Sequence, residues 1–169
     1  MRLVLATCHP LPEEDVDMVP LTDAIRAAGL PFEWLPWDAS RERFDDAVVV
    51  IRSTWDYIHR LPEFLAWADA LGDRLHNPPR VVRWNAHKGY LLELESQGIS
   101  VVPTILVHRG PAGSLSSLLS ERGWTDAVVK PAVSAGSFGT RKVSGSVTAE
   151  DERFFADLVG ARDVLVQPY

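Results

Sequence analysis

Residues 128–140 have the sequence Val-Val-Lys-Pro-Ala-Val-Ser-Ala-Gly-Ser-Phe-Gly-Thr, in which an apolar run ends in Lys130 and a turn of small residues follows. The backbone N–H groups of such a turn can converge on an anion, because few Cβ atoms obstruct the approach. Lys130 ends the expected strand just before the turn, so its ammonium group could reach a phosphate held by the turn. The segment matches neither the Walker A loop nor the G-x-G-x-x-G pattern. An exposed hairpin turn is the alternative interpretation.

Lysine is scarce in this chain: of its 17 basic residues, three are lysine, namely Lys88, Lys130 and Lys142. Arginine occupies all the other basic positions, so the use of lysine at a position indicates a site that needs its compact point charge on phosphate oxygens. Asn85 is expected to cap a helix, which would place Lys88 near the positive end of the helix dipole. A solvated surface position is the alternative for Lys88, and Lys142 is expected to be a surface residue.

The residues around the turn indicate an α/β unit over residues 85–169. Its expected elements alternate in type along the chain and are bounded by glycine, proline or capping residues. They are a helix from Asn85 to Gly98, a strand at 104–107, a helix at 115–119, a strand at 127–129, a return strand at 140–143, a helix capped by Thr148 and a strand at 164–166.

Residues 1–84 show an earlier α/β pattern. Its expected elements are a strand at 3–6, a helix from Pro20 to Gly29, strands at 32–37 and 47–51, and a helix over 61–71. This order predicts a small open domain with a largely parallel sheet. Asn77-Pro78-Pro79 is the expected boundary segment, because two prolines disfavour both helix and central strand.

The composition excludes several classes of protein. The net charge of −6, from 17 basic and 23 acidic residues, argues against sequence-independent binding to nucleic acid or to an anionic membrane. Cys8 is the single cysteine and cannot form an internal disulfide, and the five histidines show no metal-ligand spacing. No apolar run is long enough for a signal peptide or a membrane span, so a cytoplasmic location is expected.

The ordered motifs of the second half resemble the ATP-grasp superfamily, and within it the glutathione-synthetase-like branch. The resemblance depends on Asn85-Ala86-His87-Lys88, Gly98, Val101-Val102-Pro103-Thr104, Val129-Lys130-Pro131 with the loop that follows, and Val164-Leu165-Val166-Gln167-Pro168-Tyr169. It implies an incomplete ATP-grasp N-terminal lobe over residues 85–169 that binds ATP. It also implies a pre-ATP-grasp domain over residues 1–84.

The resemblance assigns the following residues to ATP. Lys88 and Lys130 would contact its phosphates, and Lys130 would also approach the adenine. The loop Ser134, Ala135, Gly136, Ser137, Phe138 and Gly139 would cover the β- and γ-phosphates. The segment Gln167, Pro168 and Tyr169 would form a hinge whose backbone pairs with the adenine edge.

Residues 52–57, Arg-Ser-Thr-Trp-Asp-Tyr, resemble a segment of the subgroup that includes the cyclo-ligase of D-cycloserine biosynthesis. They follow the carboxyl end of a predicted strand, the edge at which open α/β sheets bind ligands. Arg52, Ser53, Thr54, Trp55 and Asp56 are therefore candidates for binding an amino-acid-like zwitterion. Packing of the aromatic rings and capping of the next helix by Ser53 or Asp56 are the alternatives. Asp17 and Asp38 are weaker candidates.

The resemblance implies a ligase that activates a carboxylate as an acyl phosphate for attack by an amine or for cyclisation. The Mg²⁺ that this reaction needs would be held by ligands beyond residue 169, so no metal ligand and no catalytic residue is assigned in this chain. The chain ends on a buried-type strand and is expected to be the front part of a longer enzyme, inactive alone. A non-catalytic nucleotide-binding or interaction module is the alternative. Homo-oligomer formation is left open.

Overall fold

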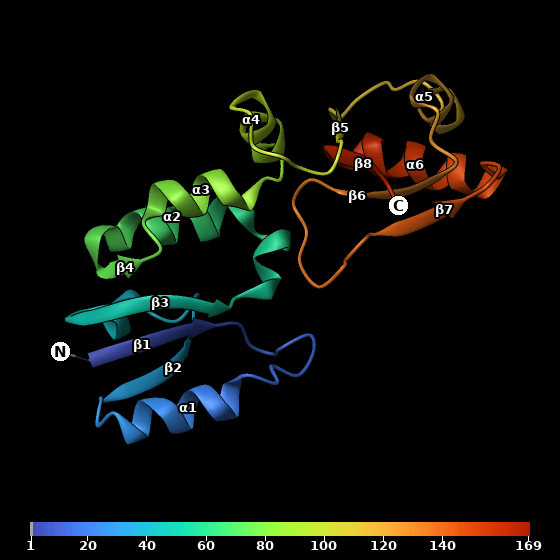
Figure 1. Ribbon diagram of the computed structural model, residues 1–169. Coiled ribbons are helices and arrows are strands. Elements are labelled where there is room, and N and C mark those ends of the chain that lie inside the picture. Colours follow the sequence, from blue (N-terminus) through green and yellow to red (C-terminus); the bar gives the residue numbers. More distant parts are fainter. Residues whose placement is uncertain (1) are drawn as a thin grey trace. The chain divides into compact units, whose positions relative to one another are not determined.

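The computed structural model describes residues 2–169, which form two compact units that divide between Trp84 and Asn85 (Figure 1). The assignment of one unit to the substrate and the other to the nucleotide stays a prediction. Within residues 2–169, no helix combines the length and the apolar character needed to cross a membrane.

The first unit contains a four-stranded sheet with the order β2-β1-β3-β4, in which every neighbouring pair is parallel. This confirms the predicted open parallel sheet. The elements are β1 (Arg2–Thr7), α1 (Met18–Ala27), β2 (Phe32–Pro36), β3 (Ala47–Ser53), α2 (Leu61–Leu71) and β4 (Leu75–His76), with 3₁₀ turns at Arg41–Phe44, Trp55–His59 and Gly72–Arg74. The short β4 and the 3₁₀ turns carry no periodic pattern that the sequence could have revealed.

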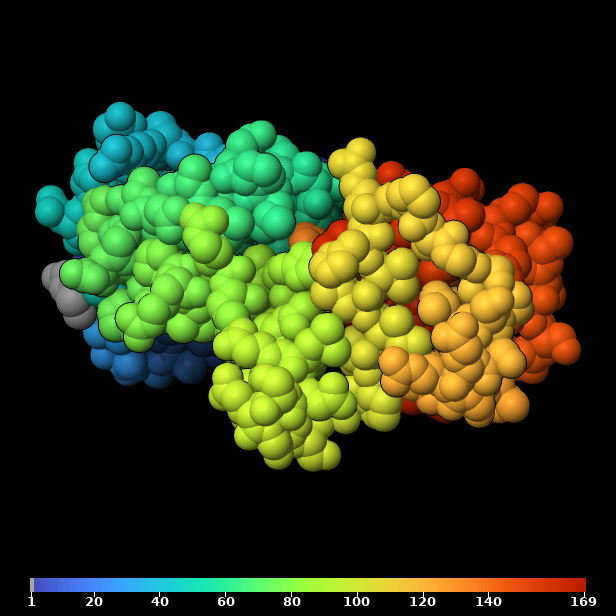
Figure 2. Space-filling model, turned by 90° about the horizontal axis from the view of Figure 1, so that it is seen from above, coloured from blue at the N-terminus to red at the C-terminus, as the bar shows by residue number. Residues whose placement is uncertain are grey.

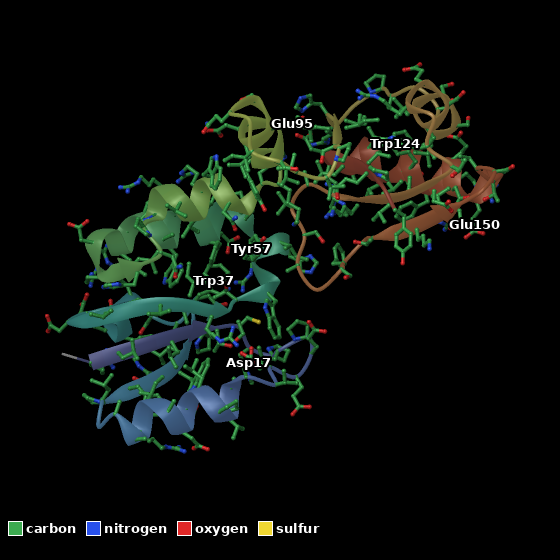
Figure 3. The ribbon with its side chains drawn as sticks, in the orientation of Figure 1. Asp17, Trp37, Tyr57, Glu95, Trp124 and Glu150 are labelled. Carbon is green, nitrogen blue, oxygen red and sulfur yellow. The ribbon has the colours of Figure 1, made fainter. Side chains whose placement is uncertain are left out.

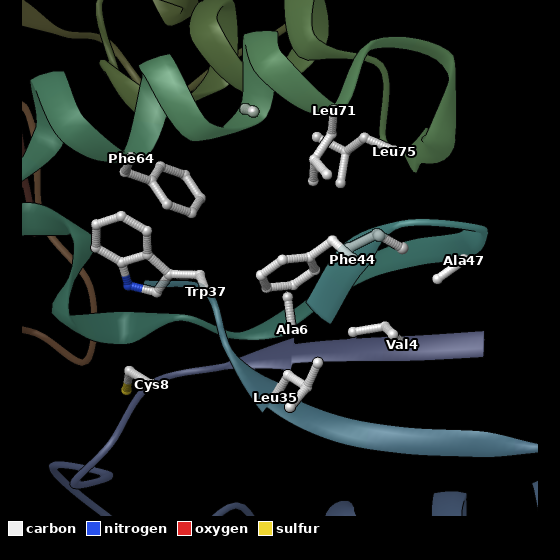
Figure 4. Close-up of a cluster of buried hydrophobic side chains, with 12 residues drawn as sticks. Val4, Ala6, Cys8, Leu35, Trp37, Phe44, Ala47, Phe64, Leu71 and Leu75 are labelled. Atoms are coloured by element: carbon white, nitrogen blue, oxygen red, sulfur yellow. The ribbon is translucent and has the colours of Figure 1, made fainter. Parts of the chain in front are cut away.

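The core of the first unit lies between the sheet and α2 (Figure 4). Val4 on β1 and Val49 on β3 are fully buried and pair directly across the two central strands. An aromatic cluster completes this core: the rings of Trp37 and Phe64 meet edge to face with their centroids 5.3 Å apart. The continuous β-branched run of β3 reflects its position inside a sheet covered on its faces.

The chain continues into α3 (Pro79–Ala86), a turn, and α4 (Tyr90–Ser96). The prediction that Asn85 caps a helix is wrong, because Asn85 lies inside α3. The prediction that the two prolines block a helix is also wrong: Pro79 begins one, since the first turn does not use the amide hydrogen that proline lacks. Lys88 consequently lies in the turn between the helices. Figure 2 shows α4 on the surface, and none of its residues is fully buried.

The second unit contains a sheet with the order β5-β8-β6-β7, in which every neighbouring pair is antiparallel. Its elements are β5 (Ile105–Val107), α5 (Leu115–Arg122), β6 (Asp126–Pro131), β7 (Arg141–Ser144), α6 (Ala149–Ala161) and β8 (Val164–Pro168). Phe155 on α6 and Val129 on β6 belong to one buried cluster beneath this sheet. Thr148 caps α6 as predicted, with a reciprocal capping box to Asp151.

Candidate functional site

Lys88 is hydrogen-bonded to the segment that follows β6. Its backbone N–H donates to the Ala132 carbonyl at 2.8 Å, and its ammonium nitrogen Nζ donates to the Ser134 carbonyl at 2.6 Å. The turn between α3 and α4 and the loop of residues 134–139 are therefore joined at two points. The structure thus brings together two segments that lie 46 residues apart in sequence.

Lys88 is also close to Lys130, the penultimate residue of β6. Burial, and then the positive charge of Lys130, hold the pKa of the Lys88 ammonium group below its ordinary value. No carboxylate among residues 2–169 forms an ion pair that compensates the charge of Lys88. Two neighbouring cations, one partly withdrawn from water, make a site that an anion would stabilise.

The loop of residues 134–139 is internally hydrogen-bonded. The Ser134 hydroxyl donates to the Phe138 carbonyl at 2.8 Å, and the Phe138 N–H donates to the Ala135 carbonyl at 2.9 Å. Gly139 has a φ of +66°, and a Cβ atom there would lie 2.9 Å from Cγ of Pro131. The loop therefore folds back on the end of β6, and this approach requires glycine. Its tip, around Ser137, is exposed.

The predicted hinge, residues 167–169, forms the end of β8 and the residue after it. Gln167 is buried, and its side-chain amide donates to the Thr104 hydroxyl at 2.8 Å. The Tyr169 N–H donates to the Asp126 carbonyl at 3.1 Å, so one of the backbone donors predicted to face adenine is engaged within the protein. The exposed Tyr169 ring lies under the ammonium group of Lys142, 3.3 Å from its centroid. The adenine role of these residues stays a prediction.

In the first unit, Arg52 is the penultimate residue of β3 and is already paired. Its guanidinium group lies 3.3 Å from Oδ1 of Asp15 and 2.8 Å from Oδ2 of Asp17. Asp15 is nearly buried, and its Oδ2 atom has no hydrogen-bond partner among residues 2–169. This carboxylate was missed by the sequence reasoning, because it lies in an irregular loop 37 residues from Arg52.

The other candidates of this segment have partners inside the protein. Asp56 accepts from Nε1 of Trp37 at 2.7 Å and from Arg60 at 2.8 Å. Arg60 also pairs with Asp38 at 2.9 Å and stacks over the Trp37 ring at 4.5 Å. Figure 3 shows Trp37 and Tyr57 directed into the interior between the sheet and α2. Asp56 and Asp38 are thus engaged within the protein. The alternative that Ser53 or Asp56 caps the next helix is wrong, because Thr54 and Arg60 hold the cap positions and neither helix has a side-chain cap.

The remaining candidates of this segment differ in exposure. The Ser53 hydroxyl shares a 2.9 Å hydrogen bond with the Thr7 hydroxyl and is buried, as is Thr54. Trp55 is half-buried. Ser53 and Thr54 are therefore less accessible to a ligand than Trp55, and the substrate role of all three stays a prediction.

Two histidines meet one carboxylate in the second unit. Nε2 of His87 lies 3.3 Å, and Nδ1 of His108 lies 3.1 Å, from Oδ2 of Asp163. No sequence pattern indicates this cluster, because its members lie on three separate segments. Within residues 2–169, no group of three or more His, Cys, Asp or Glu side chains is arranged to hold a metal ion.

Comparison with known proteins relates the chain to a group of ligases. Residues 3–77 match the family model described as "D-cycloserine synthetase DcsG, N-terminal domain". The "Cycloserine biosynthesis protein DcsG" of Streptomyces lavendulae is 32% identical over 164 residues, which cover 92% of this chain and 54% of that protein. The chain therefore spans about half the length of this curated relative.

Solved structures extend the similarity to the whole chain. The crystal structure of D-cycloserine synthetase DcsG covers 100% of this chain, and the chain covers 59% of it, with a TM-score of 0.85 and 30% identity. A RimK domain ATP-grasp protein from Sphaerobacter thermophilus has a TM-score of 0.67 at 20% identity over 100% of this chain and 64% of its own. The ATP-grasp ligase PsnB, in a structure with Mg and ADP, has a TM-score of 0.54 at 16% identity over 99% of this chain and 65% of its own.

Proposed function

On the premise that this chain is a homologue of D-cycloserine synthetase DcsG with an ATP-grasp-like fold, we propose that it supplies the ATP-binding part of an ATP-dependent ligase. The proposed reaction transfers the γ-phosphoryl group of ATP to a carboxylate. An amine of a second molecule or of the same molecule then displaces phosphate and forms a C–N bond. PsnB, an ATP-grasp ligase of the same fold, is described with Mg and ADP, which supports ATP and Mg²⁺ as the partners of this chain.

The nucleotide site that we propose lies in the second unit. Lys88 and Lys130 would neutralise phosphate oxygens, and the loop of residues 134–139 would cover them with backbone N–H groups. The Gln167–Tyr169 segment would lie along the adenine. We assign no ligand of Mg²⁺ to the residues of this chain.

The substrate site that we propose lies in the first unit, at the carboxyl ends of β1 and β3. Arg52 would meet the carboxylate of an amino-acid-like substrate after releasing one of its two aspartate partners. The unpaired Oδ2 atom of Asp15 supports this placement, because a buried carboxylate oxygen without a donor is costly and a substrate ammonium group would satisfy it. Trp55, which is half-buried and lies three positions after Arg52, would pack against the substrate.

The observation that carries the nucleotide proposal is the environment of Lys88. Its ammonium group is partly withdrawn from water, lies close to Lys130, and donates to the loop without a compensating carboxylate. Folding alone gains little from bringing two cations together, because their repulsion and desolvation are unfavourable. A bound polyphosphate would offset both the repulsion between the two cations and the cost of their desolvation, because its negative charges attract both lysines.

Titration calorimetry of the protein with Mg·ATP tests this proposal. Lys130→Ala removes a charge-assisted contact, so we expect affinity to fall by about 10- to 150-fold, equivalent to about 1.5–3 kcal/mol. Arg153→Ala removes an exposed cation of α6 in the same unit and is expected to leave affinity unchanged. Equal affinity in the Lys130 variant and the unaltered protein would remove Lys130 from the site.

A turnover assay separates a ligase from a nucleotide-binding module. Phosphate release from ATP by the complete gene product is measured with a panel of amino-acid-like carboxylates, with and without an amine. Release that depends on the carboxylate supports the ligase. Tight ATP binding without release for any carboxylate would favour the non-catalytic module.

A further inference from the structure

His87 and Asp163 close a ring of contacts that includes Lys88. The Lys88 N–H donates to the Ala132 carbonyl at 2.8 Å, and the Ala132 N–H donates to the Asp163 carbonyl at 2.8 Å. The Asp163 carboxylate then lies 3.3 Å from Nε2 of His87, the residue immediately before Lys88. The ring therefore joins the α3–α4 turn, the end of β6 and the residue before β8.

The protonation of His87 suits this arrangement. Nδ1 of His87 accepts the Gly89 N–H at 3.1 Å, so in the neutral ring the proton is on Nε2 and faces Asp163. The ring lies so close to Gly89 that a Cβ atom at that position would approach Nδ1 to 2.8 Å. The imidazole is thus held between its own turn and the carboxylate.

The Asp163 carboxylate is ionised at neutral pH, so it attracts the N–H group of His87 that faces it. Burial would raise the pKa of Asp163, but the Arg109 N–H at 2.8 Å and the nearby His108 outweigh burial and lower it. Oδ1 is occupied by Arg109, which leaves Oδ2 for the two histidines. Of these, His108 is exposed and stands outside the ring that contains Lys88.

We infer that His87 and Asp163 are positioning residues for Lys88: their contact fixes the α3–α4 turn so that the Lys88 ammonium group stays against the loop of residues 134–139. The inference rests on the proposed nucleotide site. Without the His87 contact, the turn is joined to β6 by the backbone bond of Lys88 alone within this ring. Lys88 would then sample positions away from the phosphates, and ATP affinity would fall.

A double-mutant cycle on ATP affinity tests this role. His87→Ala removes the contact of the imidazole with Asp163, and Asp163→Asn removes the carboxylate charge that both histidines approach, so each is expected to weaken ATP binding by about 2- to 12-fold. Asparagine keeps the Oδ1 acceptor for Arg109 but presents an N–H donor to His87. In the Lys88→Ala background, His87→Ala is expected to cause no further loss, because it acts through Lys88. His108→Ala is the matched control and is expected to leave ATP affinity unchanged.

Amide hydrogen exchange of Lys88 provides a readout that does not involve ATP. We expect this amide to exchange about 2- to 12-fold faster in His87→Ala and Asp163→Asn, and at the original rate in His108→Ala. Unchanged ATP affinity in both variants, with Lys88→Ala still weakening ATP binding, would overturn the positioning role and leave the nucleotide site intact. An equal further loss from His87→Ala in the Lys88→Ala background would also overturn it. Failure of the unaltered protein to bind ATP would overturn both proposals.

Discussion

Replacement of Lys88 by methionine separates a functional lysine from a structural one. Methionine keeps the length of the side chain but removes the ammonium group and its 2.6 Å hydrogen bond to the Ser134 carbonyl. A hydrogen bond from a charged group contributes about 1.5–3 kcal/mol, and its loss lowers stability. The same change removes the burial cost of the Lys88 charge and its repulsion by Lys130, and both effects oppose that loss.

These effects oppose each other in the stability of the folded protein, whereas ATP affinity has no compensating gain. We therefore expect Lys88→Met to lower the free energy of unfolding by less than about 1.5 kcal/mol while weakening ATP binding by about 10- to 150-fold. Urea denaturation gives the first quantity, and titration calorimetry with Mg·ATP gives the second. Arg153→Met, an exposed change on α6, serves as the control in both measurements.

The pH dependence of unfolding provides an internal check. The folded-state pKa of Lys88 is lowered, so its charge disfavours the folded state at neutral pH. That cost is relieved as the pH rises from the lowered folded-state pKa towards the ordinary lysine value of about 10.4, so this group makes stability increase over that range. Lys88→Met is expected to lose this contribution. A loss of 2 kcal/mol or more in stability, with ATP affinity unchanged, would refute the reasoning and make Lys88 a structural residue.

Three further predictions concern the loop after β6 and the start of α6. Gly139→Ala is expected to weaken ATP binding more than Gly145→Ala. Both glycines have a positive φ, but only a Cβ at Gly139 would meet Pro131, at 2.9 Å. Titration calorimetry compares the two variants, and equal ATP affinities would show that the close approach of Gly139 to Pro131 is unimportant for binding. Thr148→Ala is expected to cost about 0.5–2 kcal/mol in urea denaturation through loss of the cap of α6. The hydroxyl and N–H of Thr148, followed by Arg141, lower the pKa of Asp151, so its contribution to stability is present above the unfolded pKa of about 3.9 and is lost as the pH falls through the folded-state value. In Asp151→Asn this decrease in the free energy of unfolding at low pH should disappear. An unchanged dependence of stability on pH in the acid range would contradict the prediction.

Much of the fold was predictable because its signals are local. The β-branched run of β3 and the apolar run of β8 each required a buried strand, and Thr148 with Asp151 marked the start of α6. The start of α3 was predicted wrongly. Two prolines can either end a segment or begin a helix, and the choice between these depends on the packing of the residues that follow.

For the candidate site, the sequence singled out the residue types but not their contacts. The scarcity of lysine and the small-residue turn identified Lys88, Lys130 and residues 134–139, because each is visible in a short window. The resemblance to the ATP-grasp superfamily assigned them to a nucleotide.

The partners of these residues were decided by tertiary structure. The contacts of Lys88 with the loop, of His87 with Asp163, and of Arg52 with Asp15 each join residues more than 35 positions apart. Periodicity and capping signals describe a residue and its close neighbours, and they specify the elements of this protein. Which side chains then meet depends on the order and register of strands in each sheet and on the path of irregular loops, and those are fixed only when the apolar faces pack together.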